Sequence, residues 1–435
     1  MVKEGSNNME AAIVLIVFIA LVIIGVPIGW SIAGVSLLTL FFSDVSFSIL
    51  PMKMISGVNS FTFLCIPFFI LAANLMSRGG ITKRIFLFCD ALCGHFSGGL
   101  AHANVLASML FGGISGASNA DAVGLGSIEI EMMTEKGYDR GYSAAVTAAS
   151  AILSSIVPPS NIFIVYAVTA GTVTVSAMFV GGIIPAVILT LLLIALNVYY
   201  AKKYHFPKNE KFAGWKYVGK TALETLPALF MPIIILGGIL AGVFTPTESS
   251  VVAGVYALIV SAFVLHNLTW KDVYEALVES AKMTAVVMFI IAVASAMGWG
   301  ITTMRLPQKV SAWCLAMANS KLQFMFITFI LLVIIGTLVD VTPAILIIVP
   351  ILIPAARAFN VNMLYFGLFV AMTLTMGLVT PPVGMLLFTT STVAKIDLSR
   401  MYKAILPYAV VEILFCILMI FAEPILMFLP HLLGY

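Results

Sequence analysis

The peptides Val157-Pro158-Pro159-Ser160-Asn161 and Thr380-Pro381-Pro382-Val383-Gly384 each interrupt a long apolar stretch, and their proline pairs lie 223 residues apart. A proline removes a backbone donor and clashes with the preceding helical turn, and the residue before it is pushed out of α geometry. Backbone groups freed in this way inside a bilayer are tolerated only where protein or a water-filled cavity satisfies them. Broken helices at matching positions of two halves indicate the binding site of a transporter.

The composition indicates a polytopic membrane protein. Hydrophobic residues make up 61% of the 435-residue chain, charged residues make up 9%, and the mean hydropathy is +1.12. A soluble chain carries about 25% charged residues. The first apolar run, from Ala11, lacks a small-residue cleavage site and leads directly into further apolar segments, so no signal peptide is expected. The longest polar stretch is residues 201–222, which leaves no room for a large soluble domain.

Two halves of the chain share a sequence pattern. The motif at residues 69–72 resembles the motif at 289–292 at an offset of 220, and the motif at 33–35 recurs at 253–255 with the same offset. The common order and near-constant offset predict two repeats, residues 10–200 and 225–430, joined by a basic cytoplasmic linker at 201–224. We expect an all-α fold with about five crossings and one re-entrant hairpin in each repeat.

The predicted elements follow the proline and glycine positions. The first repeat is expected to contain a hairpin at 98–131 and a broken helix at 142–170, and the second a hairpin at 323–356 and a broken helix at 362–394. The other predicted crossings are 10–24, 28–43, 60–77, 176–200, 227–243, 248–266, 283–300 and 404–430. Segments 82–97, 270–282 and 305–318 mix charged with apolar residues, which is typical of arms lying in the membrane interface.

The distribution of basic residues supports an inverted repeat. With the linker in the cytoplasm, 16 Lys and Arg residues, Arg78 among them, fall inside and 6 fall outside, as the positive-inside rule requires. Because five crossings is an odd number, the second half is inverted relative to the first. The two hairpins then enter from opposite faces of the membrane, which is the arrangement expected for alternating access around a site at the midplane.

The turn of the first hairpin, residues 112–121, is rich in glycine and in neutral oxygen ligands. Ser115, Ser118 and Asn119 supply side-chain oxygens, and the carbonyls of residues 155–157 are opened by the proline pair that follows. Sodium is a hard cation that such oxygens suit, as they suit calcium. The alternative interpretation is a small-residue motif for helix packing. The polar residues beside a broken helix favour an ion site.

The second hairpin carries Asp340 in the middle of an apolar run. An intramembrane acid is costly and indicates a functional site. Asp340 is expected to cap the helix that begins near Pro343, to bind a cation, or to do both, with capping slightly favoured. Its partner surface in the second broken helix is predicted to comprise Gly377, Val379, Thr380 and Thr389.

The residues after each proline pair begin new half-helices. The amino terminus of a helix favours anions, so these termini are suited to a carboxylate substrate. The predicted substrate-binding residues are Ser160, Asn161, Val383 and Gly384. No Lys or Arg is predicted at the midplane, which argues against a large polyanion as substrate.

One further motif carries a family resemblance. The turn at residues 242–248, with Gly237-Gly238 before it and Val251-Val252-Ala253 after it, resembles the signature of the large membrane subunit of TRAP (tripartite ATP-independent periplasmic) transporters. The first hairpin, both Pro-Pro segments and the chain length match the same pattern, so the resemblance covers essentially the whole chain.

The resemblance implies an ion-transporter-superfamily fold with a scaffold domain and an elevator-type transport domain. It implies sodium-driven uptake of an organic acid across the bacterial inner membrane, with no organic cofactor and no nucleic acid. The implied partners are a small four-helix membrane subunit and a periplasmic substrate-binding protein. C4-dicarboxylates, sialic acids, sugar acids and keto acids all stay open as substrates.

The resemblance also implies two sodium sites, one where each hairpin meets its broken helix. The resemblance places the first site on Ser115, Ser118, Val157 and Pro158, and the predicted set also includes Asn119 from the hairpin turn. It places the second site on Gly336, Asp340, Gly377 and Thr380, and the predicted set also includes Thr342.

Two alternatives remain open at this point. A self-sufficient sodium–carboxylate symporter of the same superfamily would work without a binding protein. An intramembrane serine protease is the remote alternative, because Gly113-Ile114-Ser115-Gly116 reads GxSG. A serine nucleophile needs an oriented base, and neither His102 nor His266 has a matching context, so no enzyme is expected.

Overall fold

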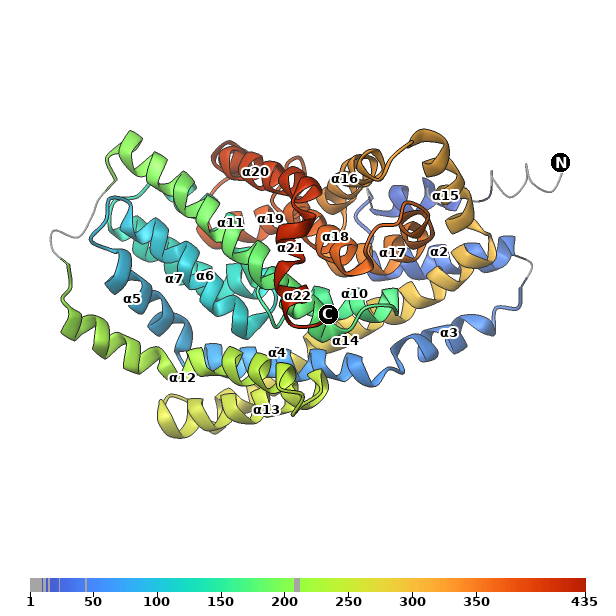
Figure 1. Cartoon of the computed structure of the whole chain (residues 1–435). Coiled ribbons are helices and arrows are strands. Elements are labelled where there is room, and N and C mark those ends of the chain that lie inside the picture. The colour runs from blue at the N-terminus through green and yellow to red at the C-terminus, as the bar shows by residue number, and fades with distance from the viewer. Residues whose placement is uncertain (1–9, 11–12, 15, 23, 44, 207–211) are drawn as a thin grey trace.

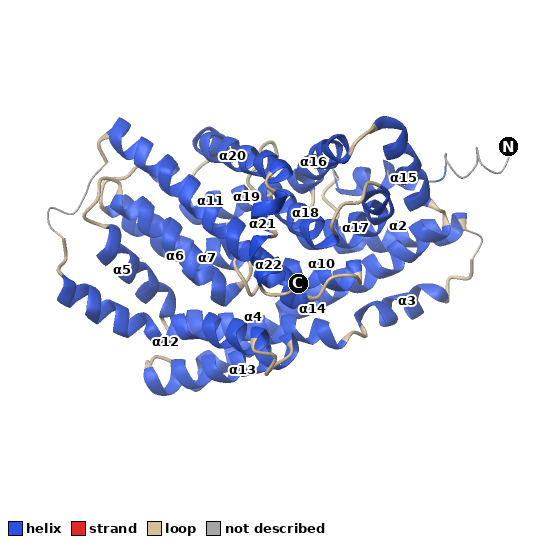
Figure 2. Cartoon of the chain, in the orientation of Figure 1, coloured by secondary structure: helices blue, strands red, loops and turns tan. Residues whose placement is uncertain are grey.

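The computed structural model describes residues 10, 13–14, 16–22, 24–43, 45–206 and 212–435. Within these residues the regular secondary structure is helical, without a β-strand (Figure 2). The predicted crossing at 10–24 falls partly on residues outside this set, as does the middle of the linker at 201–224. The remaining predicted elements can be compared with the structure directly.

Figure 1 shows how the described helices of the two halves of the chain are arranged. The first half contains α2 (Ile28–Phe42), α3 (Ile49–Val58), η1 (Phe61–Leu64), α4 (Cys65–Arg78), α5 (Ile81–Cys93), α6 (Gly99–Ser115), α7 (Ser118–Glu135), α8 (Arg140–Ala151), α9 (Leu153–Ile156), α10 (Asn161–Ala170) and α11 (Val175–Tyr204). The second half contains α12 (Trp215–Leu240), α13 (Pro246–Ile259), η2 (Val260–Val264), α14 (Trp270–Thr303), α15 (Leu306–Met317), α16 (Lys321–Leu338), α17 (Val341–Ala358), α18 (Met363–Gly377), α19 (Met385–Ala394), α20 (Leu398–Phe421), α21 (Glu423–Leu426) and α22 (Phe428–Leu432).

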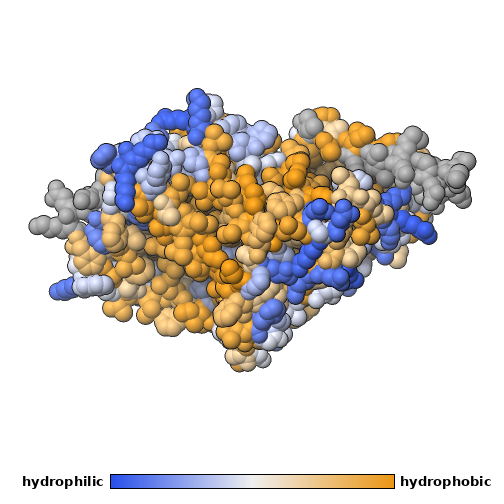
Figure 3. All heavy atoms as spheres, turned by 45° about the horizontal axis from the view of Figure 1, so that its top comes forward, coloured by the Kyte–Doolittle hydropathy of each residue, from blue (hydrophilic) through white to orange (hydrophobic). Residues whose placement is uncertain are grey.

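The helices have the length and composition of a membrane protein. Among the described residues, eight helices are long and apolar enough to cross a membrane, and the bent pair Arg140–Ile156 and Asn161–Ala170 makes up to nine spans. Large apolar side chains such as Trp30, Phe41 and Ile233 are exposed. Figure 3 shows a hydrophobic surface across the middle of one face, with strongly hydrophilic residues mainly toward its upper left and its right. The predicted all-α polytopic class is therefore confirmed.

Hairpins and broken helices recur in both halves. Helices α6 and α7 form the first hairpin, and α16 and α17 form the second. Helix α10 of the first half packs against α17 of the second, and α19 of the second half packs against α7 of the first. Helix α4 of the first half packs against α13 of the second, and α14 of the second half packs against α2 of the first. These reciprocal contacts are the ones expected from two inverted repeats.

A lower row of helices runs across Figure 1 below the hairpins and broken helices. Helix α13 packs against α4 and α12, and α14 packs against α2, α3 and α4. The structure departs here from the predicted separate arm at 270–282, because α14 is continuous from Trp270 to Thr303. Residues 270–297 contain neither glycine nor proline, so nothing interrupts the helical backbone before Gly298.

The last predicted crossing, 404–430, is also wrong in its bounds. Helix α20 begins earlier, at Leu398, and ends at Phe421, and two short helices follow it. Pro424 explains this end, because the residue before a proline is disfavoured in α geometry and the proline itself lacks a donor for the preceding turn.

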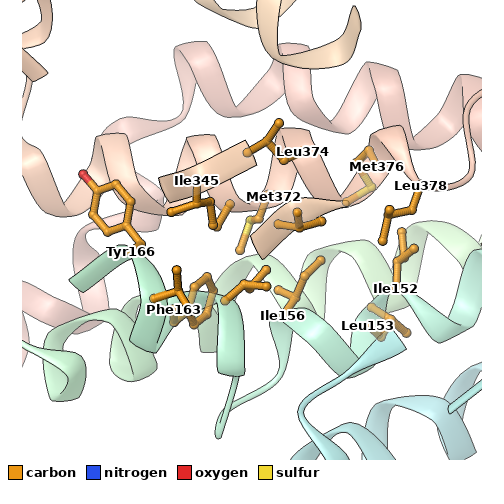
Figure 4. Packing of buried hydrophobic residues seen from close by; sticks show 14 of the residues in the cluster. Ile152, Leu153, Ile156, Phe163, Tyr166, Ile345, Met372, Leu374, Met376 and Leu378 are labelled. Carbon is orange, nitrogen blue, oxygen red and sulfur yellow. The ribbon is translucent and has the colours of Figure 1, made fainter. Parts of the chain in front are cut away.

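Buried apolar side chains hold the two broken helices against each other (Figure 4). Ile152, Leu153 and Ile156 of the first face Met376 and Leu378 of the second, and all five are at most 3% exposed. Nearer the amino terminus of α18, the Tyr166 hydroxyl donates to the carbonyl of Met363 at 2.8 Å. This dense packing fixes the two breaks relative to each other.

Candidate functional site

The first break lies between α9 and α10. The backbone leaves α geometry at Val157, where ψ is 127°, and the peptide bond between Pro158 and Pro159 is cis. Ser160 then caps α10, because its hydroxyl accepts a hydrogen bond from the amide of Phe163 at 3.4 Å and donates to the carbonyl of Ser155. The chain bends by 45° across this break.

The turn of the first hairpin lies directly against this break. A Cβ added to Gly112 would lie 2.7 Å from the Cα of Ser154, and one added to Gly116 would lie 2.5 Å from the carbonyl oxygen of Pro159. Gly116 also has φ +60°, a conformation that other residues adopt only with strain. The amide of Asn161 donates to the carbonyl of Gly116 at 3.4 Å. Glycine is therefore required here for both conformation and close approach.

Two serines join the hairpin to the broken helix. The Ser118 amide donates to the Ser155 hydroxyl oxygen at 2.9 Å, and the two hydroxyl oxygens lie 2.7 Å apart. Ser115 is 2% exposed, and its hydroxyl has no hydrogen-bond partner among the described residues. The structure thus joins the hydroxyl oxygens of Ser118 and Ser155 at a buried junction, and the buried Ser115 is the last residue of α6 beside it.

The other residues predicted for the first sodium site have different surroundings. The carbonyl oxygen of Pro158 lies 3.6 Å from a Cβ added to Gly113, so Pro158 belongs to the same junction. Val157 is the C-cap residue of α9. Asn119, by contrast, is exposed on the first turn of α7 and lines a cavity on the outer side of the hairpin. The structure does not bring Asn119 into the buried junction.

Sequence reasoning missed two side chains at this junction. The Ser155 hydroxyl contacts Ser118, and the Ser154 hydroxyl donates to Asp121 Oδ2 at 2.7 Å. Asp121 is 1% exposed and follows the hairpin turn by one helical turn. The signal was available, since Ser154 and Ser155 stand one turn before Pro158. The prediction from sequence includes the backbone carbonyl of Ser155 but not its hydroxyl.

The second break repeats the first with a closer backbone contact. A Cβ added to Gly377 would lie 2.3 Å from the carbonyl carbon of Gly336, and one added to Gly336 would lie 2.8 Å from the carbonyl oxygen of Leu374. The Gly384 amide donates to the carbonyl of Thr337 at 3.1 Å. This bond is the counterpart of the one from Asn161 to Gly116, and the Pro381–Pro382 peptide bond is also cis.

The polar residues of the second set are partly engaged in local hydrogen bonds. Asp340 is the N-cap residue of α17, and its Oδ1 accepts from the amide of Val341 at 2.7 Å. Thr342 lies in the first turn of the same helix. Thr380 donates from its hydroxyl to the carbonyl of Met376 at 2.8 Å. A hydroxyl that donates keeps its oxygen lone pairs available to a cation.

The four predicted substrate-binding residues lie at the starts of the two half-helices. Asn161 begins α10, and Gly384, with φ +60°, is the N-cap of α19. Val383 precedes Gly384 and is half-buried. Ser160 is fully buried and its hydroxyl is used in capping, so this side chain has little capacity left for a ligand.

Paired hairpins and broken helices are the arrangement found in secondary transporters that are built from structural repeats. The solved Alcanivorax borkumensis YdaH transporter has the same general fold. Its TM-score is 0.61, with 14% identity, over 86% of this chain and 88% of that one.

The sequence comparisons place the chain within that class. The family model described as "Tripartite ATP-independent periplasmic transporter, DctM component" matches residues 15–425. The chain is 36% identical to the sialic acid TRAP transporter permease protein SiaT of Haemophilus influenzae, over 99% of this chain and 70% of that protein. It is 34% identical to the C4-dicarboxylate TRAP transporter large permease protein DctM of Vibrio cholerae, over 98% of each. The chain therefore belongs to the DctM component family of TRAP transporters, as the sequence resemblance predicted.

Membership of this family also answers the question of enzymatic activity. The relatives are named as permease components of transporters, and such components are not enzymes. The Ser115 hydroxyl of the GxSG motif contacts no general base within the described residues. The chain is a multi-pass transporter subunit rather than an intramembrane protease.

Proposed function

We propose that this chain is the large permease subunit of a TRAP transporter that couples sodium entry to the uptake of an organic acid across a bacterial inner membrane. The single observation that carries the proposal is the repeated junction of hairpin and broken helix. Hydrogen bonds from Asn161 to Gly116 and from Gly384 to Thr337 tie each junction together at corresponding positions.

The ligand chemistry of the junctions supports sodium as the coupling ion. The first junction offers hydroxyl oxygens of Ser115, Ser118 and Ser155, and the proline pair frees carbonyl oxygens beside them. The second offers Asp340, Thr342 and Thr380, with the carbonyl groups near Gly336 and Gly377. Such oxygen sets suit hard cations. The unpartnered hydroxyl of Ser115 is a buried polar atom that a bound cation would satisfy.

The starts of α10 and α19 support a carboxylate substrate. Both half-helices begin shortly after a proline pair, and the positive dipole ends at their starts favour an anion. The named substrates of the two relatives, a sialic acid and C4-dicarboxylates, are carboxylates. We propose that Asn161, Val383 and Gly384 line the substrate site, and that Ser160 shapes the site by capping α10.

An elevator-type movement is the proposed mechanism. The lower row of helices around α4, α13 and α14 would form the scaffold, and the hairpins with the broken helices would move against it. The dense apolar packing between the two broken helices supports their movement as one body. The proposed partners are a small four-helix membrane subunit and a periplasmic binding protein that delivers the substrate.

The test is uptake into proteoliposomes that contain this chain, its candidate small subunit and the neighbouring binding protein. A sodium gradient is imposed, and labelled sialic acid and succinate are supplied separately. We expect uptake of at least one acid to require both the gradient and the binding protein. Sodium-driven uptake without the binding protein would favour the self-sufficient symporter instead. Uptake that continues without sodium would contradict the proposed coupling.

A further inference from the structure

A cavity of about 420 Å³ separates the first hairpin from the lower row of helices. Its walls come from α4, from α14, from the outer face of α7 and from Phe111 of α6. Ser77 of α4 approaches Gly124 of α7, where an added Cβ would lie 3.7 Å from the Ser77 hydroxyl oxygen.

The cavity wall carries one cation and one acid. Arg78 is the last residue of α4, and Glu279 faces it from α14. The other polar groups of the wall are neutral, namely Asn74, Ser77 and Asn119. Asn119 stands at the hairpin turn, so the polar wall extends from this turn toward Arg78. The predicted topology places Arg78 on the cytoplasmic side of the membrane.

The guanidinium group of Arg78 is divided between two carboxylates. Its Nη1 lies 2.7 Å from Glu275 Oε2, and its Nη2 lies 3.0 Å from Glu279 Oε2. Glu275 and Glu279 are four residues apart and share one face of α14. Neither carboxylate binds both Nη atoms. A guanidinium group binds most strongly to a single carboxylate that accepts two parallel N–H···O hydrogen bonds from it.

The contact with Glu279 is readily exchanged for another. The side chain of Glu279 is 53% exposed and that of Arg78 is 29% exposed. Exposed ion pairs of this kind are individually weak because water screens them. Glu275 lies also 3.9 Å from the amino group of Lys271, so it keeps a second cationic neighbour if Arg78 turns away. An arriving carboxylate can therefore displace Glu279 at little cost.

We propose that Arg78 binds the carboxylate of the transported acid on the cytoplasmic side, and that Glu279 competes with the acid for this arginine. The substrate leaves the hairpin along the polar wall and exchanges places with Glu279 at the guanidinium group. When the acid departs, Glu279 returns and closes the ion pair. This inference rests on the proposed function, because it assumes that an organic acid passes through the chain.

The test separates the two sides of the membrane. Proteoliposomes with the full set of subunits are preloaded with increasing concentrations of unlabelled sialic acid or succinate, and the initial rate of sodium-driven uptake of the same labelled acid is measured. Internal acid inhibits by occupying the cytoplasm-side site. In Arg78→Gln we expect the internal concentration that halves uptake to rise about tenfold, as loss of a charge-assisted hydrogen bond predicts, while the external KM changes less than about twofold.

Three variants sharpen this result. Glu279→Gln removes the competing carboxylate, so the half-inhibiting internal concentration is expected to fall. Arg78→Lys keeps the charge but loses the planar set of N–H donors. The half-inhibiting internal concentration is therefore expected to lie between the wild-type and Arg78→Gln values. Lys271→Gln is the matched control, because it removes one positive charge from the same ion-pair cluster, whereas Lys271 is 84% exposed and does not line the cavity. Thermal unfolding of each purified variant verifies that it is folded.

The outcomes distinguish this inference from the proposed function. Suppose the wild-type complex takes up the acid, and the internal concentration that halves uptake is the same in Arg78→Gln and Glu279→Gln as in wild type. That result overturns the role of Arg78 and leaves the proposed function standing. Equal shifts in Arg78→Gln and Lys271→Gln also overturn it, because they indicate a general effect of surface charge. Absence of uptake by the wild-type complex for both acids contradicts the proposed function itself, and this inference falls with it.

Discussion

Gly336 and Gly377 meet backbone to backbone where the second hairpin crosses the second broken helix, and a Cβ on Gly377 would lie 2.3 Å from the carbonyl carbon of Gly336. Gly112 and Ser154 make the corresponding contact in the first half, at 2.7 Å from the added Cβ to the Cα of Ser154. Both contacts bring hairpin carbonyl groups to a helix whose own hydrogen bonding ends nearby. This geometry makes each junction both a structural joint and the proposed ion site.

Replacing Gly377 by alanine should therefore damage both roles. The added methyl group overlaps backbone atoms that cannot move independently, and we expect a loss of about 1–3 kcal/mol in the free energy of unfolding. Thermal unfolding of the purified protein, with and without sodium, measures this loss. Gly298→Ala is the matched control, because nothing lies within 4 Å of a Cβ added there. Equal behaviour of the two variants would contradict the close contact.

Ser118→Ala and Ser155→Ala should each weaken sodium activation. Each variant removes one of the two hydroxyl oxygens that lie 2.7 Å apart at the first junction. We expect the sodium concentration for half-maximal uptake to rise about tenfold, because each variant removes one contact between an oxygen and the ion. Ser127→Ala removes an exposed hydroxyl from α7, the helix that begins at Ser118, and serves as the control. Unchanged sodium activation in both junction variants would remove these serines from the site.

Substitution of Asp340 separates capping from charge. Asp340→Asn retains an oxygen for the Val341 amide, whereas Asp340→Ala loses the cap and should cost about 0.5–2 kcal/mol of stability. We expect weakened sodium activation in both variants but a lower unfolding temperature only in Asp340→Ala. Normal sodium activation of Asp340→Asn would show that the residue acts only as a helix cap.

The contact between Asp139 and Arg400 joins the start of α8 in the first half to the first turn of α20 in the second. Burial opposes ionisation of Asp139, but the Tyr142 amide and the Arg400 guanidinium outweigh it and hold the pKa of this carboxyl below its usual value. A lowered native pKa stabilises the fold above the unfolded pKa, and this contribution is lost as pH falls through the lowered value. The side chains are more than half exposed, so we expect less than about 1 kcal/mol.

Thermal unfolding of wild type and Asp139→Asn between pH 3 and pH 7 checks this sign. The asparagine keeps the cap for Tyr142 but has no charge to titrate. We expect a small difference in unfolding temperature at neutral pH that disappears at the acidic end. A difference that grows toward acidic pH would mean that the ion pair does not stabilise the native state.

Much of this architecture was predictable because local chemistry marks it. The proline pairs at 158–159 and 381–382 end a helix wherever they occur in a membrane segment, and the glycines at 112–116 mark a tight reversal. The predicted hairpins at 98–131 and 323–356 correspond to α6–α7 and α16–α17 with small differences at their ends. The same reasoning identified Ser115 and Ser118, which lie at the first junction.

The features that sequence reasoning missed depend on tertiary contacts. The Ser155 hydroxyl acquires a role only because α9 lies against the hairpin turn. Arg78 was counted among the cytoplasmic charges, and nothing in its own sequence neighbourhood places Glu275 and Glu279 opposite it. The sequence predicts Asn119 in the first sodium site because its side-chain oxygen follows Ser118 in the hairpin turn. One residue along a helix rotates the side chain by about 100°, and this rotation carries Asn119 outward to the cavity.

The measurement that tests the central claim most directly is the simultaneous flux of labelled sodium and labelled acid in one set of proteoliposomes. The account predicts that sodium entry rises when the acid and its binding protein are supplied, and that Ser118→Ala reduces both fluxes together. Acid entry without any accompanying sodium entry in the wild-type complex would contradict coupling through this chain.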